Sequence, residues 1–358
     1  MATNEQGNGT PEAGRRAEPH SGAQQDARFD IRSHVAQTLI EAMEKGETPW
    51  QRPWSAAALR PMNATSQNQY RGVNRVLLSL APAAQRGDNR WVTYAQANAK
   101  GWRVRKGERG TMIVKVVELE ADGAQPDTER EREPPAARAG HDRPDDLERR
   151  KTVALRRYFV FNATQVDGMP PLEESQELAF DPVERAEAVL GALKEKTGLL
   201  IVHGGSKACY MPELDEVRLP PKKKFASMYD MYAVAFHEVC HSTMHPTRLD
   251  RKEAYAKRWG DEAYALEELT VEIASAVLCS ECGISERISE EQRAKHLANH
   301  VGYLQSWIKA VRSDPMAIFA AAKAAERVTQ YVLALARQAT AMQDHAEWVA
   351  AYETTPAP

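Results

Sequence analysis

The chain has 358 residues and a mass of 39.9 kDa, enough for about two domains that each bury a core. Hydrophobic residues make up 42% and charged residues 27%, the composition of a globular protein, and no apolar run reaches the roughly 18 residues of a membrane span or resembles a secretion signal. The net charge of −3 excludes nucleic-acid binding by the whole surface, so such binding would need a local basic patch.

The first half is predicted to be a mixed α/β domain over residues 29–168. Residues 1–28 lack Ile, Leu, Val, Phe, Tyr and Trp and therefore read as a disordered tail. Apolar residues then follow helical spacing from Phe29 until Gly46 ends the run, and Thr111–Val117 and Arg157–Asn162 read as strands. Residues 119–151 combine many charges with four prolines, which indicates a solvated charged insertion.

The second half is predicted to be a mainly helical domain over residues 182–340, after a linker at 169–181. Its expected helices cover residues 183–196, about 228–245 and about 261–282, and a hairpin at 208–219 forms a small antiparallel sheet. The C-terminal third is helical and rich in alanine, with a flexible end at 341–358. The fold class is therefore α+β.

The strongest motif is His237-Glu238-Val239-Cys240-His241, the HExxH pattern. On a helix, His237 and His241 share one face, so both imidazoles can bind one metal ion while Glu238 takes a proton from water. The alternative is a chance match on a solvated helix. Because residues 233–236 are all apolar, we expect this helix to be buried and its polar groups to need a partner such as a metal.

A zinc site needs a third protein ligand. Glu268 and Glu272 share a helix face, and their spacing resembles the gluzincin pattern, which implies Glu268 as the ligand and Glu272 as an acid that steadies a histidine. The two roles could be reversed between Glu268 and Glu272, and Glu267 is a further candidate for the third ligand. Two other candidates are weaker: His245 lies two turns further along, and Cys240 points off the ligand face. Zinc is the default ion, with manganese or iron as alternatives.

Two further clusters have structural explanations. Only four cysteines occur, too few for a disulfide scaffold, which fits a reducing cytoplasm as the expected location. Cys279 and Cys282 form a CxxC at a helix end and read as buried packing residues. His296 and His300 are also four apart, but no acidic partner is spaced for a second metal site, so a packing role is expected.

The first half also interleaves aromatic and basic residues, as a groove for single-stranded nucleic acid does. The alternative is that the tryptophans are core residues and the arginines a solvated face. The candidate DNA contacts are Arg52, Arg71, Asn74, Trp91, Tyr94, Arg103, Arg105, Lys106 and Arg109.

Together these motifs resemble the ArdC-type antirestriction proteins, and the first half also resembles the N-terminal part of TraC primases of conjugative plasmids. The motifs that carry the resemblance include Tyr70-Arg71-Gly72-Val73-Asn74, Val104-Arg105-Lys106-Gly107-Glu108-Arg109-Gly110, Tyr158-Phe159-Val160-Phe161-Asn162, HExxH and Tyr264-Ala265-Leu266-Glu267-Glu268-Leu269. Two features depart from the family pattern: the charged insertion, and Cys240, where the family usually has Gly.

The resemblance implies a single-stranded DNA-binding domain joined to a zincin-like metallopeptidase domain, on a mobile element, that shields incoming DNA from host restriction during conjugation. The hairpin at 208–219 would pair with an extended peptide substrate, which the sequence does not identify. Two alternatives stay open: a pure single-stranded DNA shield with a non-catalytic metal site, or a DNA-stimulated protease similar to the SprT-like group that acts on DNA-bound proteins.

Overall fold

The computed structural model describes residues 29–48, 56–119, 152–172, 181–251, 261–284 and 303–353. Residues from Ile31 onward form one compact unit. The predicted tail, nearly all of the charged insertion, part of the linker, Arg52, His296 and His300 lie outside the described residues. In the part that the structure describes, no helix is long and apolar enough to cross a membrane.

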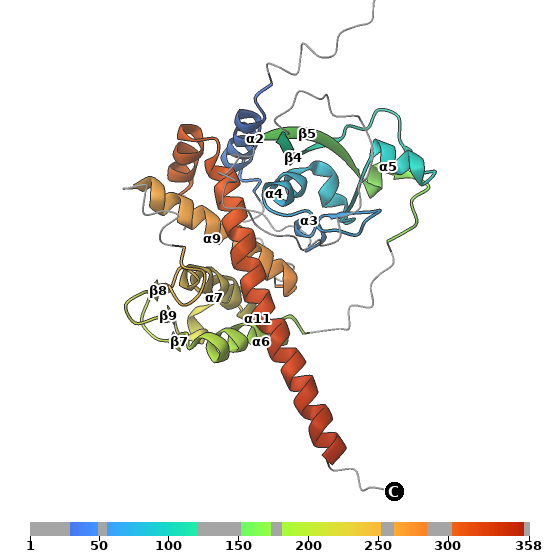
Figure 1. Ribbon diagram of the computed structural model, residues 1–358. Coiled ribbons are helices and arrows are strands. Elements are labelled where there is room, and N and C mark those ends of the chain that lie inside the picture. The colour runs from blue at the N-terminus through green and yellow to red at the C-terminus, as the bar shows by residue number, and fades with distance from the viewer. Residues whose placement is uncertain are drawn as a thin grey trace, which may run out of the picture. The chain divides into compact units, whose positions relative to one another are not determined.

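The first half begins with helix α2 (Ile31–Glu44), which lies in the predicted helical run and buries its apolar residues Val35, Leu39, Ile40 and Met43 (Figure 1). The other elements follow in chain order: α3 (Ala56–Leu59), β1 (Met62–Asn63), α4 (Val73–Leu80), η1 (Pro82–Arg86), β2 (Arg90–Thr93), α5 (Tyr94–Ala99), β3 (Arg103–Val104), β4 (Thr111–Leu119), β5 (Thr152–Asn162), η2 (Ala163–Gln165) and β6 (Val166–Asp167). This mixture confirms the predicted α+β class.

The main sheet of this half has the strand order β1-β2-β5-β4, and the whole of β4 pairs antiparallel with β5 (Figure 1). Strand β4 lies at the edge of the sheet. Asn74 on α4 covers part of that edge, because its amide donates to the carbonyl of Val114 and accepts from the N–H of Val114, both at 2.8 Å. The side chain thus replaces a missing strand at one position.

The second half contains α6 (Pro182–Thr197), β7 (Leu200–His203), β8 (Cys209–Met211), β9 (Glu216–Leu219), η3 (Lys222–Lys224), α7 (Met228–Ser242), α9 (Asp261–Glu281) and α11 (Ala317–Glu353), with a further helical segment at residues 303–313. Helix α11 reaches into the segment 341–358, which the sequence predicts to be flexible.

The expected hairpin is present as the antiparallel pair β8 and β9. The sheet is nevertheless mixed, in the order β7-β9-β8, because β7 pairs in parallel with β9. Strand β7 was not predicted, since it has only four residues and three of them are exposed, so it lacks both length and a clear apolar alternation. Strand β8 is consequently the edge strand on the other side of β9.

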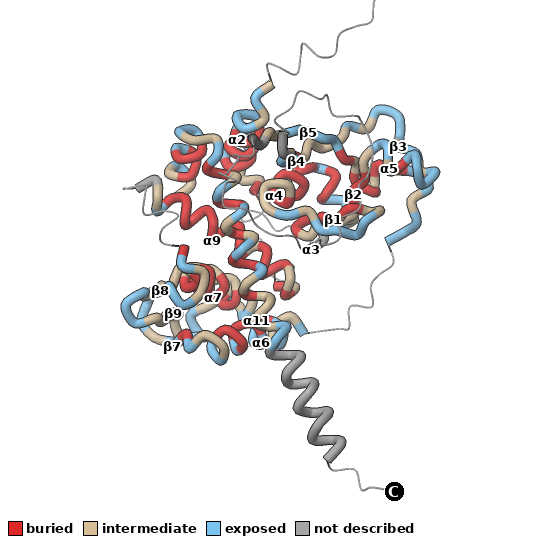
Figure 2. The backbone as a smooth tube through the Cα atoms, in the orientation of Figure 1, coloured by how far each residue is buried: buried red, intermediate tan, exposed pale blue. Residues whose placement is uncertain are grey.

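Helices α7 and α9 pack against each other, and α11 packs along α9 (Figure 1). Apolar residues of both helices, including Phe236, Val239, Leu269 and Ala274, are 0% exposed, and Figure 2 shows buried backbone along both α7 and α9. A helix that is apolar on most sides must be enclosed by other elements. The polar residues on these two helices are therefore forced together inside the domain.

Candidate metal centre

Helix α7 carries the HExxH motif and begins where the sequence predicts. The Ser227 hydroxyl accepts a hydrogen bond from the N–H of Asp230 at 3.1 Å and so caps the helix. His237 and His241 lie one turn apart on the face toward α9, with their Nε2 atoms 3.3 Å apart. Both imidazoles thus point at one place.

Helix α9 adds the third donor at that place. One oxygen of Glu268 lies 3.4 Å from Nε2 of His241, and its other oxygen lies 3.6 Å from Nε2 of His237. A tetrahedral zinc ion with ligand distances of about 2.0–2.1 Å would separate its donor atoms by roughly 3.3–3.4 Å. The spacing of His237, His241 and Glu268 therefore fits a divalent metal, and one ligand atom from each lies within 4.8 Å of the others.

Each imidazole is held from behind by its own carboxylate. Glu272 lies 3.3 Å from Nδ1 of His237, and Glu267 lies 3.4 Å from Nδ1 of His241. A carboxylate on Nδ1 leaves Nε2 as the metal-binding nitrogen and fixes the orientation of the ring. Sequence reasoning placed Glu272 in this role but left Glu267 only as an alternative ligand.

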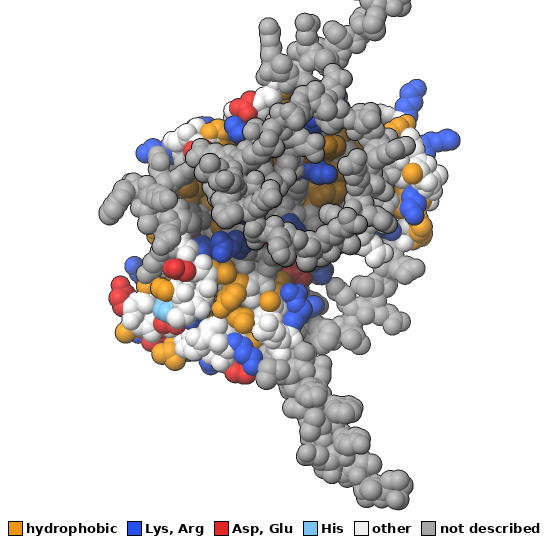
Figure 3. Space-filling view, viewed as in Figure 1, with side chains coloured by type: hydrophobic (Ala, Val, Ile, Leu, Met, Phe, Trp, Pro, Cys, Tyr) orange, Lys and Arg blue, Asp and Glu red, His pale blue; other side chains and the backbone are white. Residues whose placement is uncertain are grey.

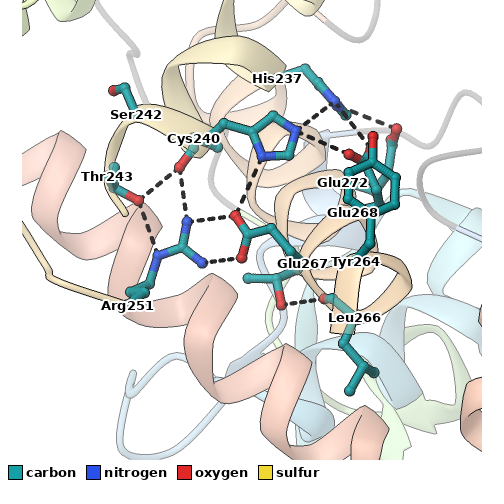
Figure 4. A network of polar contacts seen from close by, with 12 residues as sticks. His237, Cys240, Ser242, Thr243, Arg251, Tyr264, Leu266, Glu267, Glu268 and Glu272 are labelled. Atoms are coloured by element: carbon teal, nitrogen blue, oxygen red, sulfur yellow. Dashed lines mark hydrogen bonds and ion pairs between the residues drawn. The ribbon is translucent and has the colours of Figure 1, made fainter. Parts of the chain in front are cut away.

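Arg251 fixes Glu267 in turn (Figure 4). Its guanidinium donates to both oxygens of Glu267 at 2.5 and 2.8 Å, and also to the carbonyl of Cys240 and the hydroxyl of Thr243 at 3.0 and 3.2 Å. Arg251 is 3% exposed. The sequence contained no signal for this pair, because Arg251 lies outside both helices.

The three central side chains are strongly coupled by charge. Burial alone would lower the pKa of His237 and His241, but hydrogen bonds to Glu268 and to the acids behind them outweigh it and raise both. Burial would raise the pKa of Glu268, yet the two imidazoles hold it far below its usual value. The acids thus favour the protonated imidazoles, and a metal held by the same nitrogens would compete with those protons.

Glu238, the predicted proton acceptor, is 9% exposed and comes from the same helix as the two histidines. Burial raises the pKa of its carboxylate, and the nearby backbone N–H of Tyr210 on β8 opposes this effect in part. The edge strand β8 thus lies directly beside the residue that would move protons.

Tyr264 lies one turn before Glu268 on α9 and is half exposed. Its hydroxyl is 3.4 Å from that of Tyr303, and it also approaches the carboxylate of Glu268; Figure 4 shows it beside the acids. Burial and these two neighbours raise the pKa of the phenol, so it stays protonated and can donate a hydrogen bond.

The two weaker third-ligand candidates are not part of this cluster. Nδ1 of His245 lies 2.8 Å from the hydroxyl of Thr247, at the turn after α7. Cys240 is fully buried among apolar residues, and burial raises the pKa of its thiol. Cys279 and Cys282 are likewise buried free thiols, as the packing interpretation expects.

A second polar network links the β8–β9 turn to the end of α7. Arg248 donates to both oxygens of Asp215 at 2.7 and 2.6 Å and to the carbonyl of Ser242 at 3.0 Å. The hydroxyl of Tyr210 donates to Asp215 at 2.9 Å. This network positions β8 relative to the helix that carries the metal-binding histidines.

The structure corrects two of the expected DNA contacts. Trp91 is 1% exposed and packs with Leu78 and Val160 in the core, so its ring cannot stack on a base. Asn74 is also unsuited to the role, because both ends of its amide are engaged with the edge of β4. The core interpretation of the tryptophans is therefore right for Trp91.

The remaining candidates in the described residues are exposed. Arg71 lies 3.7 Å from Glu326 on α11, and Arg105 pairs with Asp167 and Glu108. The others stand on the surface: Tyr94, Arg103, Lys106 and Arg109. The candidates that remain among the described residues are thus Tyr94, Arg71 and a group of cations around β3.

Comparison with known proteins matches both halves of the chain. Residues 29–161 match the family described as the N-terminal domain of anti-restriction factor ArdC, and residues 185–324 match a zincin-like metallopeptidase family.

Curated relatives include two DNA primases named TraC from Escherichia coli, 40% identical over 309 residues and 38% identical over 314 residues. Each match covers 84% of this chain but only 27% and 20% of the primases. An uncharacterised protein of Sinorhizobium fredii, y4eC, is 36% identical over 309 residues, which cover 85% of this chain and 91% of that protein.

Among solved structures, the metal-free crystal structure of the antirestriction ArdC protein from plasmid R388 matches with a TM-score of 0.65 and 31% identity, over 87% of this chain and 99% of that one. The Mn(II)-bound structure of the same protein matches with a TM-score of 0.63 and 31% identity, over 86% and 98%. This chain therefore belongs to the ArdC family of antirestriction proteins, with a zincin-like metallopeptidase domain as its C-terminal half.

Proposed function

We propose that this protein binds single-stranded DNA through its N-terminal half, carries a metal-dependent peptidase site in its C-terminal half, and protects the incoming DNA of a mobile element from host restriction. The observation that carries the peptidase part is the convergence of His237, His241 and Glu268 within 4.8 Å, with Glu238 on the same helix. Family membership supports the antirestriction role.

A divalent metal held by these three side chains would acidify water and polarise a peptide carbonyl. Glu238 would accept the proton of the attacking water and pass it to the leaving amine, a role supported by its burial next to the donor set. Tyr264 would donate a hydrogen bond to the oxygen that gains negative charge, a role supported by the raised pKa of its phenol. Zinc is our preferred ion, and the Mn(II)-bound relative makes manganese the alternative.

The peptide substrate would bind in extended form along β8. This strand is at the edge of its sheet, and the N–H of its Tyr210 already reaches Glu238. A peptide that adds to the edge by main-chain hydrogen bonds would pass in front of the proton acceptor. The network of Asp215 and Arg248 keeps the strand in that position.

Binding of single-stranded DNA is supported by the exposed cations around β3 and by the match to the ArdC N-terminal domain. We expect the binding to weaken steeply with salt, as contacts to phosphates do. The similarity to TraC primases covers only a part of those proteins, so priming is not part of the proposal.

Glu238→Gln tests how the two activities are related. The variant should retain metal and DNA affinity but lose cleavage of an unfolded protein such as casein. Cleavage at the wild-type rate would contradict the mechanism. Restriction protection measured on the same variant then decides between coating and proteolysis: full protection assigns it to DNA coating alone. Cleavage that rises on addition of single-stranded DNA would instead favour a protease acting on DNA-bound proteins.

A further inference from the structure

Three aromatic rings lie together on one face of the main sheet. Phe159 and Phe161 are two residues apart on β5 and therefore project to the same side. The ring centroids of Phe161 and Tyr94 are 6.5 Å apart at an interplanar angle of 62°. Phe159 is 50% exposed and Tyr94 is 58% exposed. The order Tyr94, Phe161, Phe159 thus forms a row whose two ends are open to solvent.

The backbone beside this row is shaped to hold it. A Cβ at Gly110, just before β4, would lie 3.1 Å from Cβ of Phe159 and 3.2 Å from Cζ of Phe161. Glycine therefore leaves room for the Phe161 ring across the backbone of the neighbouring strand. At the other end, the capping box of Thr93 and Gln96 fixes Tyr94 as the first residue of α5.

Exposed cations lie in the segments next to the row: Arg109 precedes Gly110, and Arg103 lies on β3, which contacts α5. Arg103, Lys106 and Arg109 are exposed, and in the described part of the chain no carboxylate pairs with any of them. Figure 3 shows Lys and Arg side chains among apolar ones on the side of the molecule where α5 and β3 lie. Exposed apolar groups near charges of one sign that lack opposite partners indicate a binding surface for a ligand of opposite charge.

We propose that Tyr94, Phe161 and Phe159 form the base-stacking surface for single-stranded DNA, with Arg103, Lys106 and Arg109 taking its phosphates. The row would bind unpaired bases, because only they offer their faces to aromatic rings. The inference rests on the proposed DNA binding and deepens it: the aromatic contact moves from the buried Trp91 to Phe159 and Phe161.

Tyr158 provides a matched control. It is the neighbour of Phe159 on β5 and is 41% exposed, but it projects to the opposite face, on the same side as Lys115 and Arg156. Removing the ring of Tyr158 thus changes the same strand by a similar amount without touching the row. The comparison also tests whether the opposite face, which has its own cations, is the true binding surface.

The experiment measures binding of a fluorescent oligo(dT) by anisotropy to the full-length wild type and to Phe159→Ala, Tyr94→Ala, Phe159→Trp and Tyr158→Ala. Phe159→Ala and Tyr94→Ala should each bind about 5- to 150-fold more weakly, since a stacked base contributes about 1–3 kcal/mol. Phe159→Trp should bind as tightly as the wild type, and Tyr158→Ala should stay within about twofold of it. Tyr94 lies on a different element from Phe159. If Phe159→Ala does not fold, Tyr94→Ala therefore still tests the stacking surface.

Wild-type protein that does not bind oligo(dT) would overturn the proposed DNA binding and this surface with it. Wild type that binds, with Phe159→Ala and Tyr94→Ala binding equally well, would overturn only the stacking surface. The same conclusion follows if Tyr158→Ala is the variant that loses affinity.

Discussion

Arg251 and Glu267 form a buried bidentate ion pair behind the metal-binding face of His241. The arginine comes from the segment after α7 and the acid from α9, so the pair ties both sides of the candidate site together. A carboxylate held by two charge-assisted hydrogen bonds has little freedom to turn. The orientation of one metal ligand therefore depends on a residue that does not touch the ligand set.

Arg251→Leu should weaken metal binding by about 10- to 100-fold, because Glu267 would no longer hold His241 in place. It should also lower the free energy of unfolding by about 3–5 kcal/mol, since it leaves a buried carboxylate without its partner. Competition with a chelator and denaturant unfolding measure the two effects. Arg251→Lys keeps the charge and should fall between wild type and the leucine variant; wild-type metal affinity in Arg251→Leu would contradict this role.

Glu272→Ala should also reduce metal affinity by about 10- to 100-fold, since Glu272 supports His237 as Glu267 supports His241. Glu281→Ala, at the far end of the same helix, serves as the control and should bind metal like the wild type. Isothermal titration of metal-stripped protein with zinc measures both variants. Equal affinities in the two would show that Glu272 does not support the site.

Asp215 should make the stability of the second half sensitive to acid. Burial would raise its pKa, but hydrogen bonds from Arg248 and Tyr210 outweigh burial and hold it below the ordinary value of 3.8. A group with a lowered folded-state pKa stabilises the protein above its unfolded pKa and loses this contribution as the pH falls through the folded value. The thermal unfolding temperature of the wild type should therefore fall more steeply below about pH 4 than that of Asp215→Asn, which lacks the titrating group. Parallel pH profiles would exclude this contribution.

Tyr264→Phe should reduce the turnover of casein by about 100-fold, as removal of a hydrogen bond to a developing oxyanion does. Metal content should be unchanged, because the three ligands stay in place. Turnover equal to that of the wild type, with normal metal content, would leave Tyr264 without a role in the reaction.

The core of the site was predictable from local spacing. His237 and His241 are one turn apart on a helix whose apolar neighbours predicted burial, and Glu268 and Glu272 repeat the same spacing on the next long helix. Such patterns depend only on helical geometry. The distances between the two helices then place Glu268 at the histidines.

The parts that escaped prediction depend on tertiary contacts. No local sequence pattern predicts that Arg251 pairs with Glu267, sixteen positions away. No local pattern distinguishes the buried Trp91 from the exposed Phe159 either. Aromatic residues in a strand fit a core and a nucleic-acid surface equally well, and only the packed sheet shows which face is covered. Parallel pairing of β7 with β9 likewise requires knowledge of the crossover that joins them.

The most direct test of the central claim is anomalous X-ray diffraction from crystals of the protein grown with zinc or manganese. We predict one strong peak between Nε2 of His237, Nε2 of His241 and the carboxylate of Glu268, with Glu267 and Glu272 behind the imidazoles. A peak ligated by other residues, or no peak at this position with metal in excess, would contradict the account.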